Sequence, residues 1–148
     1  MEVNEIKDIE KRSRSDVRDS AFKLVFENLL RDDDIQELYN VADEIDEINV
    51  DDDVKNMVDG TLAHSEEIDR IIESYSKSRK LSRISKINHA ILRIAVYECL
   101  YDEKTPDNAA ISEAVKLADT YTYREDVNFI NGVLGAFSRD RQNGEENA

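Results

Sequence analysis

Hydrophobic residues recur every three to four positions along most of the chain, with charged residues between them. One such stripe runs from Val17 to Leu29, and others run through 35–45, 54–75, 109–121 and 125–137. This spacing places the hydrophobic side chains on one face of an α-helix. The chain has a single Pro and only four Gly, so few residues interrupt these helices. The pattern predicts an all-α protein.

The most hydrophobic stretch is INHAILRIAVYECL, at 87–100. Its hydrophobic residues cover more than half of a helix circumference, which is typical of a helix buried on most sides. We therefore expect this helix at the centre of a bundle, with Ile91, Ile94 and Ala95 in the core. The stripe at 54–75 has room for a break at Gly60 or near His64, so we expect six or seven helices.

The two ends of the chain differ from the part between them. We expect a flexible arm at 1–13, a helical domain at 14–138 and a disordered tail at 139–148, because both ends are polar and lack a hydrophobic stripe. No stretch is long and hydrophobic enough to cross a membrane, and the N-terminus does not resemble a signal peptide. With a single cysteine as well, the sequence indicates a cytoplasmic protein.

Charge is distributed unevenly along the chain. The net charge is −14, but segment 32–76 has 16 Asp or Glu against two Lys or Arg, whereas 77–93 has six Lys or Arg and no acid. The aspartate runs 32–34 and 51–53 precede helical stripes, where they favour helix starts. The acidic segment therefore has a structural explanation, and the total charge does not exclude binding to RNA.

A basic cluster marks the start of the first helix. Its members are Lys11, Arg12, Arg14 and Arg18. Arg14 and Arg18 are one helical turn apart, so their guanidinium groups can clamp adjacent phosphates. A solvated basic surface is the alternative, and the same two readings apply to the basic residues at 77–86.

Residues that could support catalysis are few. His64 and His89 are isolated in sequence, so we expect each to be a helix-surface or packing residue, and Cys99 lies within the hydrophobic helix, where we expect a packing role. The four glycines form no phosphate-binding loop, and the aspartate runs lack the glycine and glutamate of a calcium loop. The sequence indicates no enzyme, no cofactor and no metal site.

One short stretch, NFINGVL at 128–134, places two asparagines and a glycine inside a hydrophobic helix. We expect Asn131 and Gly132 to hold the last helix against its neighbours. Phe129 has two open interpretations. It can belong to the core, or it can stack on an unpaired base, as aromatic side chains do in proteins that bind single-stranded RNA.

Four motifs together resemble the NusB family of bacterial transcription antitermination factors. They are RSDVRDSAFKLVF (14–26), AILRIAVYE (90–98), AISEAVKLAD (110–119) and FINGVLGAF (129–137), and they occur in the order and spacing of the family. The resemblance implies a single-domain helical bundle without enzymatic activity. It also implies binding to boxA, a short single-stranded RNA element, together with the ribosomal protein NusE, which tethers the transcript to elongating RNA polymerase. Some members of the family self-associate, so a homodimer is a further option.

The resemblance also implies a set of RNA-binding residues, which are Arg14, Arg18, Phe26, Glu125 and Phe129, with Lys11 and Arg12 adding less specific attraction. This chain departs from the family by Ser15, Asp16 and Val17 in the opening motif and by Ser112 in the third. Because Asp16 and the acidic helices repel RNA, we expect weak binding by the chain alone and tighter binding with NusE.

Two alternative functions remain open at this point. One is a helical protein-interaction domain with little RNA binding of its own. The other is an accessory role in ribosomal RNA processing, since the same domain occurs fused to RNA methyltransferases. A methyltransferase would require a second polypeptide here.

Overall fold

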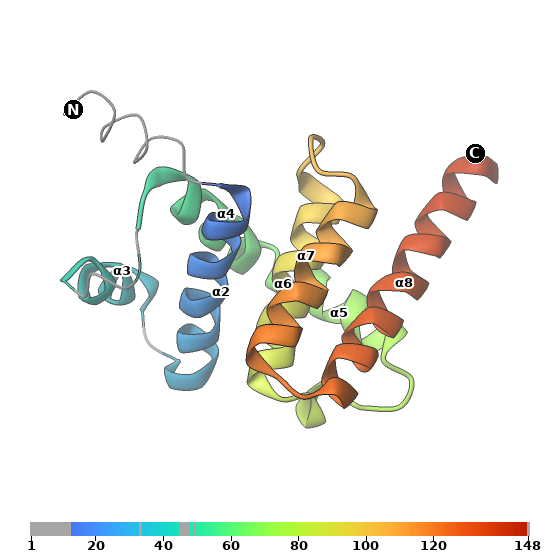
Figure 1. Cartoon of the computed structure of the whole chain (residues 1–148), viewed down its shortest axis with the longest axis horizontal. Helices are drawn as coiled ribbons and strands as arrows, with labels where there is room; N and C mark the ends of the chain where they lie inside the picture. Colours follow the sequence, from blue (N-terminus) through green and yellow to red (C-terminus); the bar gives the residue numbers. More distant parts are fainter. Residues whose placement is uncertain (1–12, 33, 45–47, 49, 148) are drawn as a thin grey trace.

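The computed structural model describes residues 13–32, 34–44, 48 and 50–147. Lys11, Arg12 and the rest of the expected N-terminal arm up to residue 12 lie outside this part. The described residues form seven α-helices and no strand, so the all-α prediction is confirmed (Figure 1). The helices are α2 (Arg14–Arg31), α3 (Ile35–Glu44), α4 (Asp52–Ala63), α5 (Ser65–Tyr75), α6 (Lys86–Tyr101), α7 (Asp107–Tyr121) and α8 (Arg124–Asn147), with a short 3₁₀ helix, η1 (Leu81–Arg83), before α6.

The starts of α2, α4 and α6 are set by side chains that accept hydrogen bonds from free backbone N–H groups. The Ser13 hydroxyl accepts from the N–H of Asp16 (3.1 Å) and begins α2, and Ser85 begins α6 in the same way. The carboxylate of Asp51 accepts from the N–H of Val54 at 2.9 Å, as expected for the second aspartate run. The stripe at 54–75 does break at His64, which separates α4 from α5.

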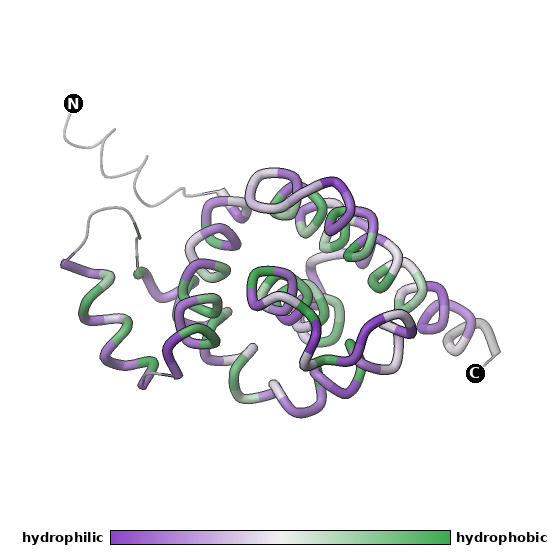
Figure 2. The backbone as a smooth tube through the Cα atoms, turned by 90° about the horizontal axis from the view of Figure 1, so that it is seen from below, coloured by the Kyte–Doolittle hydropathy of each residue, from purple (hydrophilic) through white to green (hydrophobic). Residues whose placement is uncertain are grey.

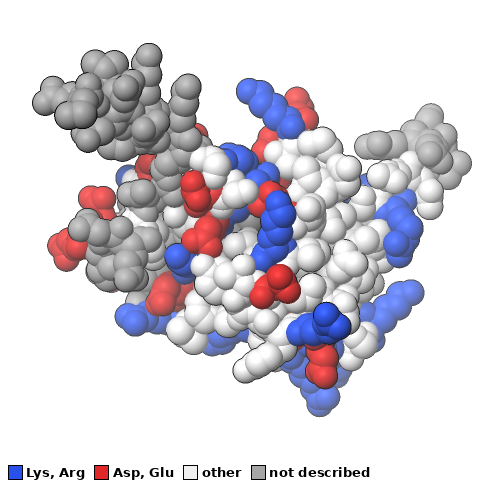
Figure 3. Space-filling view, in the orientation of Figure 1, with Lys and Arg blue, Asp and Glu red and all other residues white. Residues whose placement is uncertain are grey.

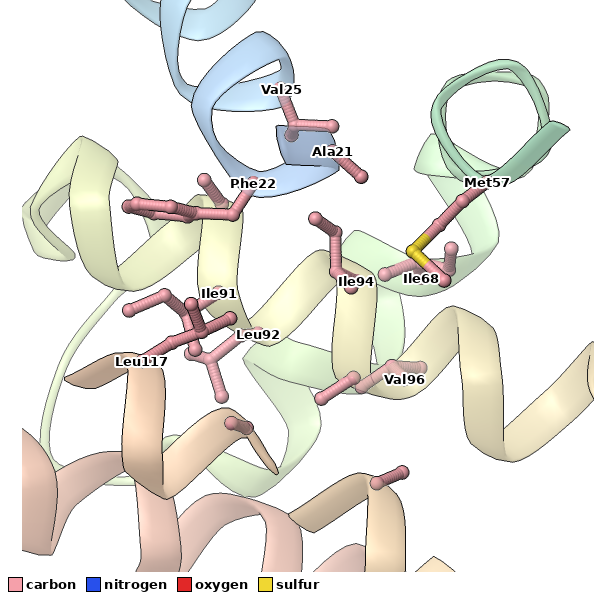
Figure 4. Packing of buried hydrophobic residues seen from close by; sticks show 14 of the residues in the cluster. Ala21, Phe22, Val25, Met57, Ile68, Ile91, Leu92, Ile94, Val96 and Leu117 are labelled. Carbon is pink, nitrogen blue, oxygen red and sulfur yellow. The ribbon is translucent and has the colours of Figure 1, made fainter. Parts of the chain in front are cut away.

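Helix α6 is the centre of the bundle. It contacts α2, α4, α5, α7 and α8, and its residues Ile91, Ile94 and Ala95 are buried as predicted. Figure 4 shows α6 side chains between Phe22 of α2, Met57 of α4 and Leu117 of α7. Viewed along the bundle, the hydrophobic positions of the helices turn toward this middle (Figure 2). A helix that is hydrophobic on most sides can be buried only if other helices surround it.

Helix α8 is longer than the sequence predicted. The expected helix end near Phe137 and the disordered tail from Arg139 are wrong, because α8 continues to Asn147. Two contacts support the added turns. The Tyr75 hydroxyl donates to Asp140 (2.7 Å), and Arg141 forms an ion pair with Asp107 (2.8 Å). A polar segment without a hydrophobic stripe is thus held by side-chain contacts with α5 and α7.

A polar network joins α5 to α6. Asp69 accepts hydrogen bonds from Arg93 (2.7 and 2.9 Å) and lies 2.7 Å from Nε2 of His89. Burial alone raises the pKa of the Asp69 carboxyl, but the hydrogen bonds and charges of His89 and Arg93 outweigh burial and lower that pKa to about 2. His89 is buried within this network and therefore has a structural role.

The first prediction concerns the core. Ile94→Ala removes a side chain that is 2% exposed, so we expect the free energy of unfolding to fall by roughly 2–5 kcal/mol. Urea denaturation followed by circular dichroism measures this change. A loss below about 0.5 kcal/mol would show that Ile94 is not enclosed.

The second prediction concerns pH. Because the folded-state pKa of Asp69 lies below its unfolded value, the ionised carboxylate stabilises the fold above about pH 4, and this contribution is lost as pH falls toward 2. We expect Asp69→Asn to lower the free energy of unfolding by about 2 kcal/mol at pH 7. The difference from wild type should shrink between pH 5 and pH 2. Urea denaturation at several pH values tests this, and a difference independent of pH would contradict it.

Candidate nucleic-acid interface

The buried side chain of Arg18 joins α2 to α6. Its Nε and Nη2 donate to the two carboxylate oxygens of Glu98 at 2.6 and 2.9 Å, and both side chains are buried. Glu113 of α7 lies 3.9 Å from the same guanidinium group. Such a two-point pair fixes both position and orientation. Arg18 therefore has a structural role in this fold.

Arg14 lies one turn earlier and is more exposed. Its guanidinium group pairs with Asp102 at 2.9 Å, and 43% of its side chain is exposed. It lines a pocket of about 480 Å³ together with Tyr97, Tyr101 and Lys104. An exposed ion pair of this kind is weak, so a phosphate can compete for Arg14.

These contacts bear on the predicted pair of phosphate-binding arginines. Only Arg14 of the two is exposed to solvent, whereas Arg18 is buried. Both guanidinium groups already bind carboxylates. Phosphate binding stays a prediction for both residues, but for Arg18 it requires the loss of a buried ion pair. Among the described members of the basic cluster, Arg14 is the residue whose guanidinium group a phosphate can reach.

Aromatic side chains gather at the opposite end of α2, where α7 ends and α8 begins. The Phe22 ring stacks on Phe26 (6.2 Å between centroids) and contacts Tyr121 (5.1 Å). Phe26 is partly buried against the core. Tyr123, in the connection between α7 and α8, is 82% exposed and was not singled out from the sequence.

Phe129 lies on α8 beside a groove between α5 and α8. The ring is partly buried against the core, and the guanidinium carbon of Arg79 lies 4.4 Å from its centroid. The ring thus packs partly against the core, and stacking on a base stays a prediction. The groove has a volume of about 790 Å³ and is lined by Ser74, Tyr75, Ser76, Lys77, Ser78, Asn128, Phe129, Gly132, Val133, Ala136 and Asp140.

The packing role expected for Asn131 and Gly132 is wrong. Both residues are exposed, and a Cβ added to Gly132 meets nothing within 4 Å. Helix packing therefore does not require glycine here, although glycine in a helix costs about 0.5–1 kcal/mol relative to alanine. Glu125 is also exposed, in the first turn of α8. This face of α8 is open to a partner.

Four exposed basic residues lie at the connection between α5 and α6. Lys77, Lys80, Arg83 and Lys86 are all exposed. In Figure 3, blue side chains gather at the lower right, below α8 and around this connection. The run without acids at 77–93 was the sequence signal for this surface, but it could not show that the groove and Phe129 lie beside it.

The predicted site residues fall at two ends of the molecule. Arg14 pairs with Asp102 after the last turn of α6, whereas Asn88 in the first turn of α6 donates to Asp126, one turn before Phe129. At a rise of 1.5 Å per residue, Asn88 and Asp102 are about 20 Å apart along α6. Only an extended ligand can contact both Arg14 and Phe129.

The described residues offer no metal site and no reactive thiol. No group of three or more His, Cys, Asp or Glu in that part of the chain is arranged to hold a metal ion. Burial raises the pKa of the Cys99 thiol to about 12, so it is a poor nucleophile. None of the helices described is long and hydrophobic enough to span a membrane.

Known proteins resemble this chain over most of its length. The sequence profile of the NusB family matches residues 15–139. The transcription antitermination protein NusB of Acetivibrio thermocellus is 42% identical over 120 residues, which are 80% of this chain and 83% of that protein. The same protein of Finegoldia magna is 38% identical over 134 residues, which are 88% of this chain and 97% of that protein.

A solved structure extends the comparison to the fold. The crystal structure of the antitermination factors NusB and NusE in complex with dsRNA contains a chain with 28% identity and a TM-score of 0.76. The match covers 86% of this chain and 96% of that chain.

The third prediction separates the two arginines. Arg18→Ala leaves the buried Glu98 carboxylate without its partner, so we expect a loss of roughly 3–5 kcal/mol in the free energy of unfolding. Arg14→Ala, the matched control, removes an exposed ion pair and should cost no more than about 1 kcal/mol. Urea denaturation measures both. Equal and small losses would show that the Arg18–Glu98 pair does not hold α2 against α6.

Proposed function

The chain belongs to the NusB family, and we propose that it is a transcription antitermination factor that binds boxA RNA together with NusE and tethers it to elongating RNA polymerase. The observation that carries this proposal is the match to antitermination proteins over most of both chains. The solved relative bound to NusE and double-stranded RNA supports NusE and RNA as partners. The proposed role is non-enzymatic and cytoplasmic.

The proposed RNA-binding domain comprises residues 14–138, and its surface suits an extended strand. Arg14 at one end supplies a cation for phosphates, and Phe26, Glu125 and Phe129 lie toward the other end. Lys11 and Arg12 add positive charge next to Arg14 in sequence. Because Arg14 and Phe129 are separated along α6, a single nucleotide cannot contact both, but a strand of several nucleotides can. Arg18 positions α2 from inside.

Net charge explains why NusE is part of the proposal. A protein with a charge of −14 repels a polyanion at long range, and four of its accessible cations gather at the connection between α5 and α6. A basic partner bound beside these cations would add phosphate contacts and reduce the repulsion. The open groove between α5 and α8, with accessible backbone at Gly132, is a surface where a second macromolecule can approach closely.

The fourth prediction tests this function. We expect a boxA-like single-stranded RNA to bind weakly to the chain alone and markedly more tightly when NusE is present, because NusE supplies further contacts. Fluorescence anisotropy titrations with and without NusE measure the two affinities. A scrambled RNA and a duplex of the same length are the RNA controls. Equal affinity with and without NusE, or no preference for the boxA-like strand, would contradict the proposal.

The same titrations define the role of Arg14. Arg14→Ala should weaken binding to all RNA sequences alike. It should also lower the slope of log affinity against log salt concentration by about one. Arg70→Ala, an exposed arginine in the acidic segment, is the matched control and should change neither quantity.

A further inference from the structure

One side of the Phe129 ring is covered by Arg79. The Arg79 guanidinium carbon lies over the ring, 4.4 Å from its centroid. A base can therefore stack directly on Phe129 from that side only after Arg79 has moved away. The sequence singled out the phenyl ring, but the structure places a planar cation on top of it.

Arg79 is held in this position from two directions. Its backbone is bound by the buried Ser76, because the Arg79 N–H donates to the Ser76 carbonyl (3.0 Å) and the Ser76 hydroxyl donates to the Arg79 carbonyl (2.9 Å). Its guanidinium group lies 3.7 Å from the carboxylate of Asp126, which in turn accepts a hydrogen bond from the buried Asn88 (2.8 Å). The orientation of Arg79 is thus largely set before any ligand binds.

The side chain nevertheless keeps a free surface. About a third of it is exposed (35%), and the exposed lysines Lys77 and Lys80 flank it in sequence. A guanidinium group is planar, permanently charged and weakly hydrated, so it stacks on bases as aromatic rings do. Its charge also attracts the phosphates beside the base.

We propose that Arg79 forms the base-binding face, and that Phe129 is a positioning residue that supports it from below. A base of the bound RNA stacks on the free face of the guanidinium group, which gives a layered order of base, Arg79 and Phe129. This inference rests on the proposed function and goes beyond it, because it moves the base contact from the ring to the arginine.

The competing arrangement makes opposite predictions. If a base stacks directly on Phe129, Arg79 blocks it, and removing Arg79 leaves the RNA affinity unchanged or increases it. If Arg79 is the stacking face, Arg79→Ala weakens RNA binding by about 5- to 150-fold, the range observed for one lost stacked base. The sign of the change therefore decides between the two.

The fifth prediction uses RNA titrations in the presence of NusE at several salt concentrations. We expect Arg79→Lys to weaken binding nearly as much as Arg79→Ala, because lysine lacks the planar group that stacks on a base. The salt slope should stay at the wild-type value, because lysine retains the positive charge. Lys80→Ala is the charge control and should lower the slope without a base-specific loss. Arg79→Lys with wild-type affinity would overturn the proposal, since charge alone would then be sufficient.

A double-mutant cycle tests the role of Phe129. Phe129→Leu keeps a hydrophobic side chain against the core. When Arg79 is present, this change should weaken RNA binding, because the guanidinium group loses the ring that supports it. In the Arg79→Ala background the same change should cause no further loss. Equal losses in both backgrounds would mean that the ring contacts the base independently and would overturn the proposal. Urea denaturation of each variant confirms that the fold is retained.

The outcomes also separate this inference from the proposed function. If the wild-type chain with NusE binds no RNA, both fail. If the wild type binds RNA and Arg79→Ala binds it equally well or better, only the stacking role of Arg79 fails.

Discussion

The buried pair between Arg18 and Glu98 is the contact on which much of the arrangement depends. Two charges inside a protein are tolerated only when each has a partner with good geometry, so this pair permits few other placements of α2 on α6. Since α6 also contacts α4, α5, α7 and α8, the position of α2 fixes where its ends lie relative to the whole bundle. Arg14 is thereby placed beside the C-terminal end of α6, and Phe26 toward the end where α8 begins.

The same constraint decides which cations a ligand can contact. Arg18 and Arg93 are basic in sequence, but both are buried and bound to carboxylates. The accessible charge is therefore smaller than the sequence suggests. It includes Arg14 on one side and Lys77, Lys80, Arg83 and Lys86 around the α5–α6 connection on the other. An acidic protein with small separate basic surfaces is suited to bind a polyanion as part of a complex, where a partner supplies further charge.

In helix α8, one short stretch of residues contributes both to the core and to the surface. Its residues Ile130, Val133 and Leu134 are buried, whereas Asn131 and Gly132 between them face solvent. Phe129 lies at the boundary between the two, under Arg79. The stretch 128–134 therefore packs through its hydrophobic residues, and its amides and glycine are exposed.

The sequence by itself determined the helices, their order and the central position of α6, because the spacing of hydrophobic residues and the capping residues act locally. It also indicated the family, since four motifs occur in the right order. Only the tertiary structure decided that Arg18 is buried, that Arg79 covers Phe129, and that α8 continues past Phe137. Each of these depends on residues far apart in the chain, such as Glu98 for Arg18 and Tyr75 for Asp140. Local patterns show that a residue is charged or aromatic, but the partner that it meets after folding decides whether that charge or ring is available for binding.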